Sequence, residues 1–220
     1  MFACRCISAV IAAFVLASLA PATATQSVAS GAFAGCPTHG AGGDPQLNEL
    51  KNRSVTPASA SSTDVAGMKQ LPRPPAGTPA MRANWPASTR ATIVSHEAEA
   101  VDFTGYIVRV THETGDPSNC GSALPRDEDV ELFLAVHPGT SDSKQIILAE
   151  VTPRWRAVHT SWRTANLRDI AEAGNRVRVT GWLIYDEESW GDTHGRTATP
   201  WEIEPITAIA VWRKSSWTND

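Results

Sequence analysis

The sequence predicts an all-β fold with one or two short helices, in which a five-stranded barrel follows an irregular N-terminal arm. Three observations lead to this prediction. Five segments after residue 90 are rich in β-branched and aromatic residues, one helical pattern separates the third from the fourth, and a glycine interrupts each of the two long ones. An interior glycine in a strand marks a bulge or a sharp coil, which a small closed barrel requires.

The first residues are typical of a cleavable signal peptide (residues 1–24). Arg5 precedes an apolar run over residues 7–19, and small residues follow over residues 21–24, in the order that a signal peptidase recognises. The apolar run is shorter than the ~20 residues that cross a bilayer. We therefore expect cleavage after Ala24 and an exported product, periplasmic or secreted, with no membrane span.

Export determines the expected state of the cysteines. Cys4 and Cys6 leave with the signal peptide, whereas Cys36 and Cys120 enter a compartment that oxidises thiols. We expect a disulfide between them that ties the arm to the loop after the first strand, and a pair of buried free thiols is the alternative. Two isolated cysteines supply too few ligands for a structural zinc site.

The exported chain is mildly acidic. The full chain has 19 Lys and Arg; without Arg5, 18 remain against 23 Asp and Glu, which gives a net charge of −5. Nonspecific binding to nucleic acid draws its free energy from neutralised phosphates. A nucleic-acid partner is therefore not expected.

Residues 25–90 form the predicted arm, because they are rich in Ala, Ser, Thr, Gly and Pro and contain few large apolar side chains. Asp44 can cap a helix, Pro45 suits the first helical position, and Leu47 and Leu50 share a face, which predicts a short helix near residues 45–53. The prolines of residues 71–79 predict an extended linker. Residues 88–99 are ambiguous and fit a short helix outside the barrel.

The barrel is predicted over residues 91–214, and residues 215–220 are expected to form a tail. Strands are expected at residues 101–110, 129–136, 145–152, 176–186 and 201–212, with a helix at 166–173 that Gly174 ends. The turn composition of residues 137–140 predicts an antiparallel hairpin between the second and third strands. The order β-β-β-α-β-β is that of the OB-fold, whereas an SH3-like barrel lacks a helix at this place.

A resemblance to a known family rests on several segments of the chain: Cys36-Pro37, residues 47–53, Gly105-Tyr106, and residues 118–120, 150–154, 177–183 and 196–205. Together they resemble a family of uncharacterised bacterial exported proteins with an OB-fold-like domain. The resemblance implies an exported barrel with a docked arm and no established activity. The family pattern has histidines where this chain has Glu131 and Glu204, which weakens any metal site implied by the family, although carboxylates also bind metals.

Carboxylates on the predicted strands are candidates for chemistry. Asp129 and Glu131 share one face of the second strand, and Glu202 and Glu204 share one face of the fifth. Glu131 and Glu150 are expected to be cross-strand neighbours in the hairpin. The alternative is that these groups form ion pairs with arginines across the sheet or face water.

Arg154 and Arg196 are candidates for phosphate-binding groups near these carboxylates. Glu131, Glu150 and Glu204, with Arg154 and Arg196 nearby, have the composition of a metal-dependent phosphodiester hydrolase. In such an enzyme, oxygen ligands hold a divalent cation and guanidinium groups bind phosphate.

Tryptophans are concentrated in the second half of the chain, where seven of the eight lie. Exposed tryptophans stack on sugars and bases, whereas buried ones would plug the barrel and hold the arm. His194 lies in the loop before the fifth strand, which borders the ligand face in OB-folds. The candidate ligand-binding residues are Arg154, Trp155, Arg156, Trp182, Trp190, His194, Arg196 and Trp201.

These observations favour a non-catalytic binding module for an envelope or extracellular ligand, which would be a saccharide, a peptide or a protein partner. No residue is assigned as catalytic, since the sequence has no paired histidine spacing and no nucleophile motif. The binding module needs no cofactor, whereas the hydrolase alternative needs a divalent cation. A structural envelope protein is the third interpretation.

Overall fold

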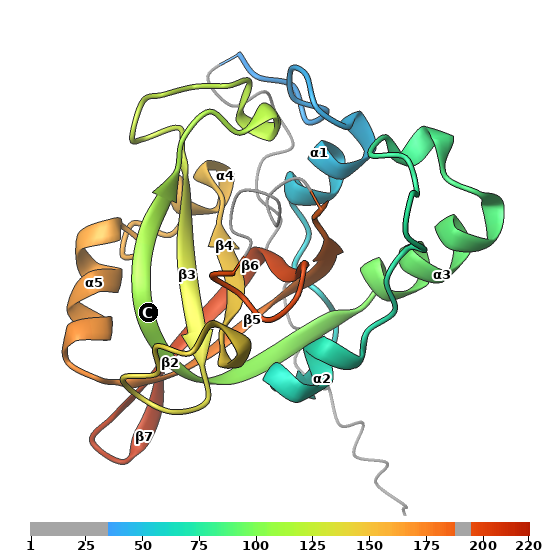
Figure 1. The fold of residues 1–220 in the computed structure, drawn as a ribbon. Coiled ribbons are helices and arrows are strands. Elements are labelled where there is room, and N and C mark those ends of the chain that lie inside the picture. Colours follow the sequence, from blue (N-terminus) through green and yellow to red (C-terminus); the bar gives the residue numbers. More distant parts are fainter. Residues whose placement is uncertain (1–34, 188–194) are drawn as a thin grey trace, which may run out of the picture.

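The computed structural model describes residues 35–187 and 195–220, and its architecture is mostly β with a few short helices (Figure 1). The predicted signal peptide, Trp190 and His194 lie outside these residues. Within the described ranges, no helix is long and apolar enough to cross a membrane. The strands are β1 (Ser61–Thr63), β2 (Ala100–Glu113), β3 (Asp129–Ala135), β4 (Ile147–Val151), β5 (Arg176–Tyr185), β6 (Trp201–Arg213) and β7 (Ser216–Asn219).

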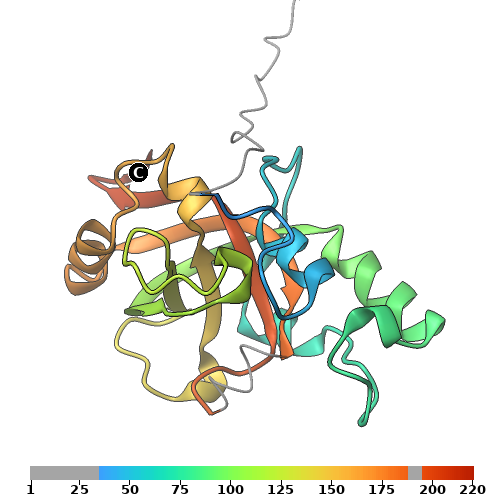
Figure 2. The ribbon, with the colours of Figure 1, turned by 90° about the horizontal axis from the view of Figure 1, so that it is seen from above.

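The helices are short and lie around the sheet. α3 and α5 lie on opposite sides of the molecule (Figure 2), where α3 contacts β5 and α5 packs against β2. The α-helices are α1 (Pro45–Lys51), α2 (Val65–Gln70), α3 (Ala87–Glu97), α4 (Pro153–Arg156) and α5 (Thr164–Glu172), with 3-10 turns at Arg82–Asn84, Pro117–Asn119 and Ser143–Gln145.

Five of the strands pair in a closed circuit. β2 pairs antiparallel with both β3 and β5, β3 pairs with β4, and β5 pairs with β6. β4 and β6 complete the circuit through a parallel pair between Ala149 and Ile203. These strands and α5 lie close to the ranges that the sequence predicts. β1 and β7 were not predicted; they add to β2 and β6 outside the circuit, so that residues 216–219 are a strand within the predicted tail.

Gly105 and Gly181, the interior glycines of the two long strands, lie where neighbouring strands approach closely. A Cβ atom on Gly181 would lie 2.6 Å from the carbonyl oxygen of Pro205, and the pairing of β5 with β6 is irregular at this point. A Cβ atom on Gly105 would collide with the carbonyl oxygen of Ala135. The irregular pairing expected at an interior glycine is present at Gly181, whereas the irregular pairing of β2 with β3 lies between Ile107 and Arg109, just after Gly105.

The sheet formed by β3, β4 and β6 is buried on both faces. Leu132, Ala149 and Ile203 point into the hydrophobic core. The alternate residues include Glu150 and Glu204, which are equally buried. Every residue of β3 and β4 is buried, so another segment must cover the acidic face.

That segment is the arm. The side chain of Asp44 caps α1 by accepting a hydrogen bond from the backbone nitrogen of Gln46 at 2.9 Å, as predicted, and α1 contacts β5 and β6 (Figure 2). The helix buries Leu47 and Lys51 rather than Leu47 and Leu50. A cationic side chain therefore points toward the acidic face. The arm also holds β1 and α2, which give it more regular structure than its composition predicts, whereas α3 matches the short helix expected over residues 88–99.

Candidate metal centre

Carboxylates from several strands and loops converge beneath α1, on the face of the sheet opposite the core. One is partly buried and the others are almost completely buried. We call this group the carboxylate cluster: Glu113 of β2, Asp116 of the following turn, Asp129 of β3, Glu150 of β4, Asp186 after β5, and Glu202 and Glu204 of β6.

The cluster contains two sets of oxygen atoms that are close enough to share an ion. In the first set, Glu113, Asp129 and Glu150 each place one carboxylate oxygen within 4.8 Å of the others. Asp186, Glu202 and Glu204 form the second set by the same measure. Oxygen ligands lie ~2.4 Å from a bound calcium ion, so two of them on opposite sides of it are ~4.8 Å apart. Both sets have the spacing of a cation site.

Lys51 lies among these carboxylates. Its Nζ is 2.7 Å from Asp116, 2.8 Å from Asp186 and 3.7 Å from Glu204. Burial opposes the charged ammonium, but the surrounding carboxylates outweigh burial and raise the pKa of Lys51 well above its usual value. Lys51 therefore contributes one positive charge to the cluster.

One positive charge does not balance the cluster. Burial raises the pKa of Asp129 to about 8, and repulsion from Asp116 adds to the effect. Asp116 differs, because Lys51 and a hydrogen bond from Ser118 outweigh its burial and hold its pKa at about 2. Burial also raises the pKa of the glutamates well above their usual value, namely Glu113, Glu150, Glu202 and Glu204. Their ionised forms need further positive charge.

Glu150 is the member of the cluster whose side chain has no partner. It is fully buried, and neither carboxylate oxygen has a hydrogen bond or an ion pair among the described residues. Neither oxygen of Glu204 accepts a hydrogen bond from a residue that the structure describes, and Lys51 is its ion-pair partner. Native proteins pair almost all buried polar atoms, because an unpaired one costs about 1–3 kcal/mol. The centre therefore has the chemistry of a site that takes a cation.

Two of the three predicted metal ligands belong to the cluster. Glu131 and Glu150 are cross-strand neighbours, as predicted, but Glu131 joins neither set of ligand oxygens. Its carboxylate accepts a hydrogen bond from the hydroxyl of Thr111 and lies 3.4 Å from Arg196. Glu131 therefore has the ion-pair role that was the alternative.

Sequence reasoning missed Lys51, Glu113, Asp116 and Asp186 as members of the site. Asp116 and Asp186 lie just beyond the ends of strands, where the alternation of side chains no longer tells which face a residue joins. Lys51 lies on a helix remote in sequence. The shared face of Glu202 and Glu204 was the signal that the sequence did contain.

The predicted ligand-binding residues mostly hold the arm. Trp155 and Trp201 are fully buried, which favours the core role over stacking on a ligand. Arg154 donates hydrogen bonds to the side chain of Asn52 and to the carbonyl of Cys36. The indole nitrogens of Trp155, Trp182 and Trp201 donate to the carbonyls of Arg53, Val55 and Pro72. Of the others, Arg156 binds carbonyls of the loop before β3, and Arg196 pairs with Glu131.

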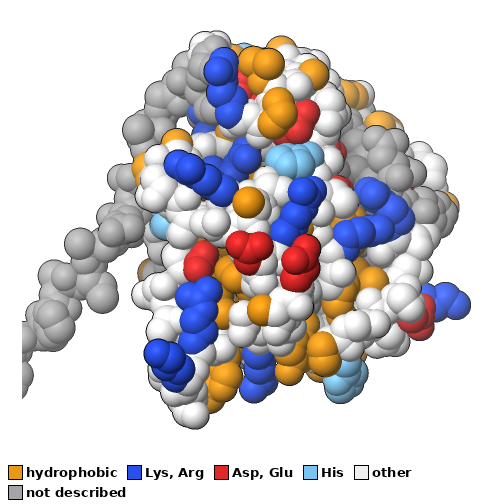
Figure 3. Space-filling model, turned by 90° about the vertical axis from the view of Figure 1, so that its left-hand side faces the viewer, with side chains coloured by type: hydrophobic (Ala, Val, Ile, Leu, Met, Phe, Trp, Pro, Cys, Tyr) orange, Lys and Arg blue, Asp and Glu red, His pale blue; other side chains and the backbone are white. Residues whose placement is uncertain are grey.

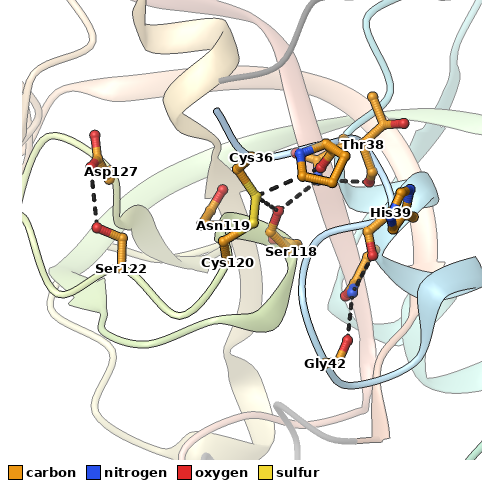
Figure 4. Close-up of a disulfide and its surroundings, with 12 residues drawn as sticks. Cys36, Thr38, His39, Gly42, Ser118, Asn119, Cys120, Ser122 and Asp127 are labelled. Carbon is orange, nitrogen blue, oxygen red and sulfur yellow. Dashed lines mark hydrogen bonds between the residues drawn. A yellow bond between two sulfur atoms is a disulfide. The ribbon is translucent and has the colours of Figure 1, made fainter. Parts of the chain in front are cut away.

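The predicted disulfide between Cys36 and Cys120 is present, with the two Cα atoms 5.8 Å apart (Figure 4). The side-chain amide of Asn52 donates to the carbonyl of Ser118 at 2.9 Å and to that of Thr38 at 3.0 Å. These bonds fix the start of the arm beside the turn that carries Asp116.

Comparison of the chain with protein-family models, with curated proteins and with solved structures finds no match.

Replacing Lys51 with methionine is expected to destabilise the metal-free protein by about 3–5 kcal/mol, because the buried carboxylates lose their ammonium partner. Urea unfolding followed by tryptophan fluorescence, in the presence of a chelator, measures this loss. Lys69→Met is the matched control, since Lys69 is exposed on α2, and should change stability by less than about 0.5 kcal/mol. Equal effects of the two substitutions would contradict the role of Lys51.

Proposed function

We propose that this protein is an exported, OB-fold-like binding module that holds a divalent cation in the carboxylate cluster, without catalysis. The observation that carries the proposal is the fully buried Glu150, whose oxygens have no hydrogen-bond partner in the described part of the chain and which places one oxygen in a set of ligand oxygens. All the ligand carboxylates belong to the strands and the segments next to them, whereas Lys51 of α1 pairs with Asp116 and Glu204 and so joins the arm to the same cluster.

The strand pairing supports an OB-fold-like barrel. The circuit runs β2-β3-β4-β6-β5 and returns to β2, with α5 between β4 and β5 in the chain. This is the order of a five-stranded OB barrel in which the third and fifth strands pair in parallel. The disulfide is compatible with export, and so is the signal peptide that the sequence predicts.

The ligand chemistry favours calcium over softer metals. All the candidate ligands are carboxylate oxygens, which prefer hard cations such as Ca²⁺, Mg²⁺ and Mn²⁺. Calcium takes six to eight oxygens in irregular geometry, whereas magnesium requires an octahedron and retains water. A crowded, buried group of carboxylates therefore suits calcium better.

The surroundings of the cluster favour holding a cation over hydrolysis. A hydrolytic centre needs open coordination positions on the metal and guanidinium groups that face the substrate. Here α1 and the disulfide-linked turn cover the cluster. Arg154 binds the arm and Arg196 pairs with Glu131, so that both predicted phosphate-binding groups are engaged elsewhere.

Calorimetric titration of chelator-treated protein with CaCl₂ and MgCl₂ tests the proposal. We expect calcium to bind, and Glu150→Gln to weaken binding at least tenfold by removing one charged ligand. Glu131→Gln is the control, because Glu131 is the cross-strand neighbour of Glu150 but lies outside the ligand sets. The calcium affinity of this variant should be within twofold of that of the wild type. Absence of calcium, magnesium and manganese binding by the folded wild type would refute the proposal.

A further inference from the structure

A different part of the sheet presents exposed aromatic and cationic side chains. Trp212 of β6 is 41% exposed and pairs across the strands with Trp217 of β7, which is half-buried. Their ring centroids are 5.2 Å apart, in an edge-to-face arrangement. Arg176 and Arg178 of β5 are exposed beside them. We call these four residues the tryptophan–arginine face.

The two arginines lie against an indole ring instead of a carboxylate. The guanidinium carbon of Arg178 is 5.2 Å from the ring centroid of Trp217, and that of Arg176 is 6.0 Å from it. Neither arginine has an ion pair among the described residues, in a chain whose acidic residues outnumber its basic ones. A guanidinium held by an aromatic ring keeps its N–H donors free for an anion.

Short side chains lie next to these large ones. The pairing register places Arg178 between Thr104 of β2 and Ala210 of β6, and it places Asn219 of β7 next to Ala210. Ala210, which is buried, therefore lies between Arg178 and Asn219, and the hydroxyl of Thr104 lies on the other side of Arg178. Aromatic, cationic and amide groups together can bind a ring that carries both hydroxyl and carboxylate groups.

We propose that the tryptophan–arginine face binds an acidic polysaccharide, whose sugar rings lie on the indoles and whose carboxylates bind Arg176 and Arg178. Local charge complementarity supports this ligand, because Arg176 and Arg178 are exposed and give this face two positive charges that can bind carboxylates. A nucleic acid fits less well, since its binding depends on neutralising many phosphates along the strand. Basic and acidic side chains are interspersed on the side of the molecule that carries α5 (Figure 3).

This inference does not rest on the cation site. The carboxylate cluster takes Glu202 and Glu204 from the beginning of β6, whereas Trp212 lies near its end. The polysaccharide can therefore bind in a chelator, and the cation can bind without the polysaccharide. The two proposals can fail separately.

Affinity gel electrophoresis and calorimetry with polygalacturonate, in a chelator at low salt, test the proposal. We expect the folded protein to bind polygalacturonate and to bind its fully methyl-esterified form, which keeps the rings but lacks the charges, at least tenfold more weakly. The double variant R176Q/R178Q should lose at least tenfold in affinity for polygalacturonate, and Trp212→Ala should also weaken binding.

The matched control is K69Q/K144Q, which removes two positive charges from exposed lysines elsewhere and should bind within twofold of the wild type. Equal losses in both double variants would show a nonspecific charge effect and would overturn the proposal. It would also be overturned if the wild type bound no polygalacturonate, or bound single-stranded DNA or phosphatidylglycerol vesicles more tightly at the same ionic strength.

Discussion

Removing calcium with a chelator is expected to destabilise the protein much more at pH 8 than at pH 5. In the chelated protein, burial raises the pKa of Asp129 to about 8 and that of Glu150 and Glu204 well above its usual value. A group whose folded pKa is raised contributes its stability below the unfolded pKa, and this contribution is lost as the pH rises through the folded pKa. The chelated protein should therefore lose stability from about pH 4 to pH 8.

Calcium reverses this trend, because it binds the ionised carboxylates and competes with protons for them. At pH 8, free calcium at one hundred times its Kd should add about 2.7 kcal/mol to the free energy of unfolding. At pH 5 protons occupy the carboxylates, and the gain from calcium should be close to zero. Urea unfolding at pH 5 and pH 8, with and without chelator, measures the four stabilities. Glu150→Gln should reduce the difference between pH values, whereas Glu131→Gln should leave it unchanged. A chelator effect of the same size at both pH values would contradict the role of the cluster.

Reduction of the disulfide is expected to lower the free energy of unfolding by about 4 kcal/mol. Cys36 and Cys120 are 84 residues apart, and a cross-link that closes a loop of this length removes much conformational entropy from the unfolded chain. Oxidised and reduced wild type form the matched pair, because they share every side chain. Urea unfolding at pH 7 in saturating calcium, with and without reductant, measures the change, and a difference below 1 kcal/mol would contradict the expectation.

The strands of the sheet could be predicted because their signals are local. Alternating β-branched residues and the glycines at 105 and 181 mark β2 and β5, and Asp44 with Pro45 marks the start of α1. The disulfide followed from the predicted export of the chain, which leaves two cysteines and therefore one intramolecular pair. β1 was missed because its three residues owe their strand geometry to the free edge of β2.

The carboxylate cluster could be predicted only in part, since it depends on contacts between distant segments. Strand alternation placed Glu202 with Glu204 and Glu131 opposite Glu150, as the structure has them. It does not tell which way a long side chain leans along the strand, and the carboxylate of Glu131 contacts Thr111 and Arg196 instead of joining a ligand set. The sequence also gives no sign that the arm fills the acidic face with Lys51, because α1 and β6 are more than a hundred residues apart.

The hydrogen bonds between the arm and the later strands constrain the order in which the parts of the protein can fold. Arg53 donates to the carbonyl of Leu183, and the indole of Trp201 donates to the carbonyl of Pro72, with sequence separations of 130 and 129 residues. Chains are synthesised from the N-terminus, so the arm exists long before the strands that hold it. The disulfide to Cys120 and the pairing of β1 with β2 need less of the chain, but these two hydrogen bonds need nearly the whole polypeptide, and contacts of such long range make folding slow. The arm is thus made before the strands that it contacts, and it is among the last segments to complete its contacts.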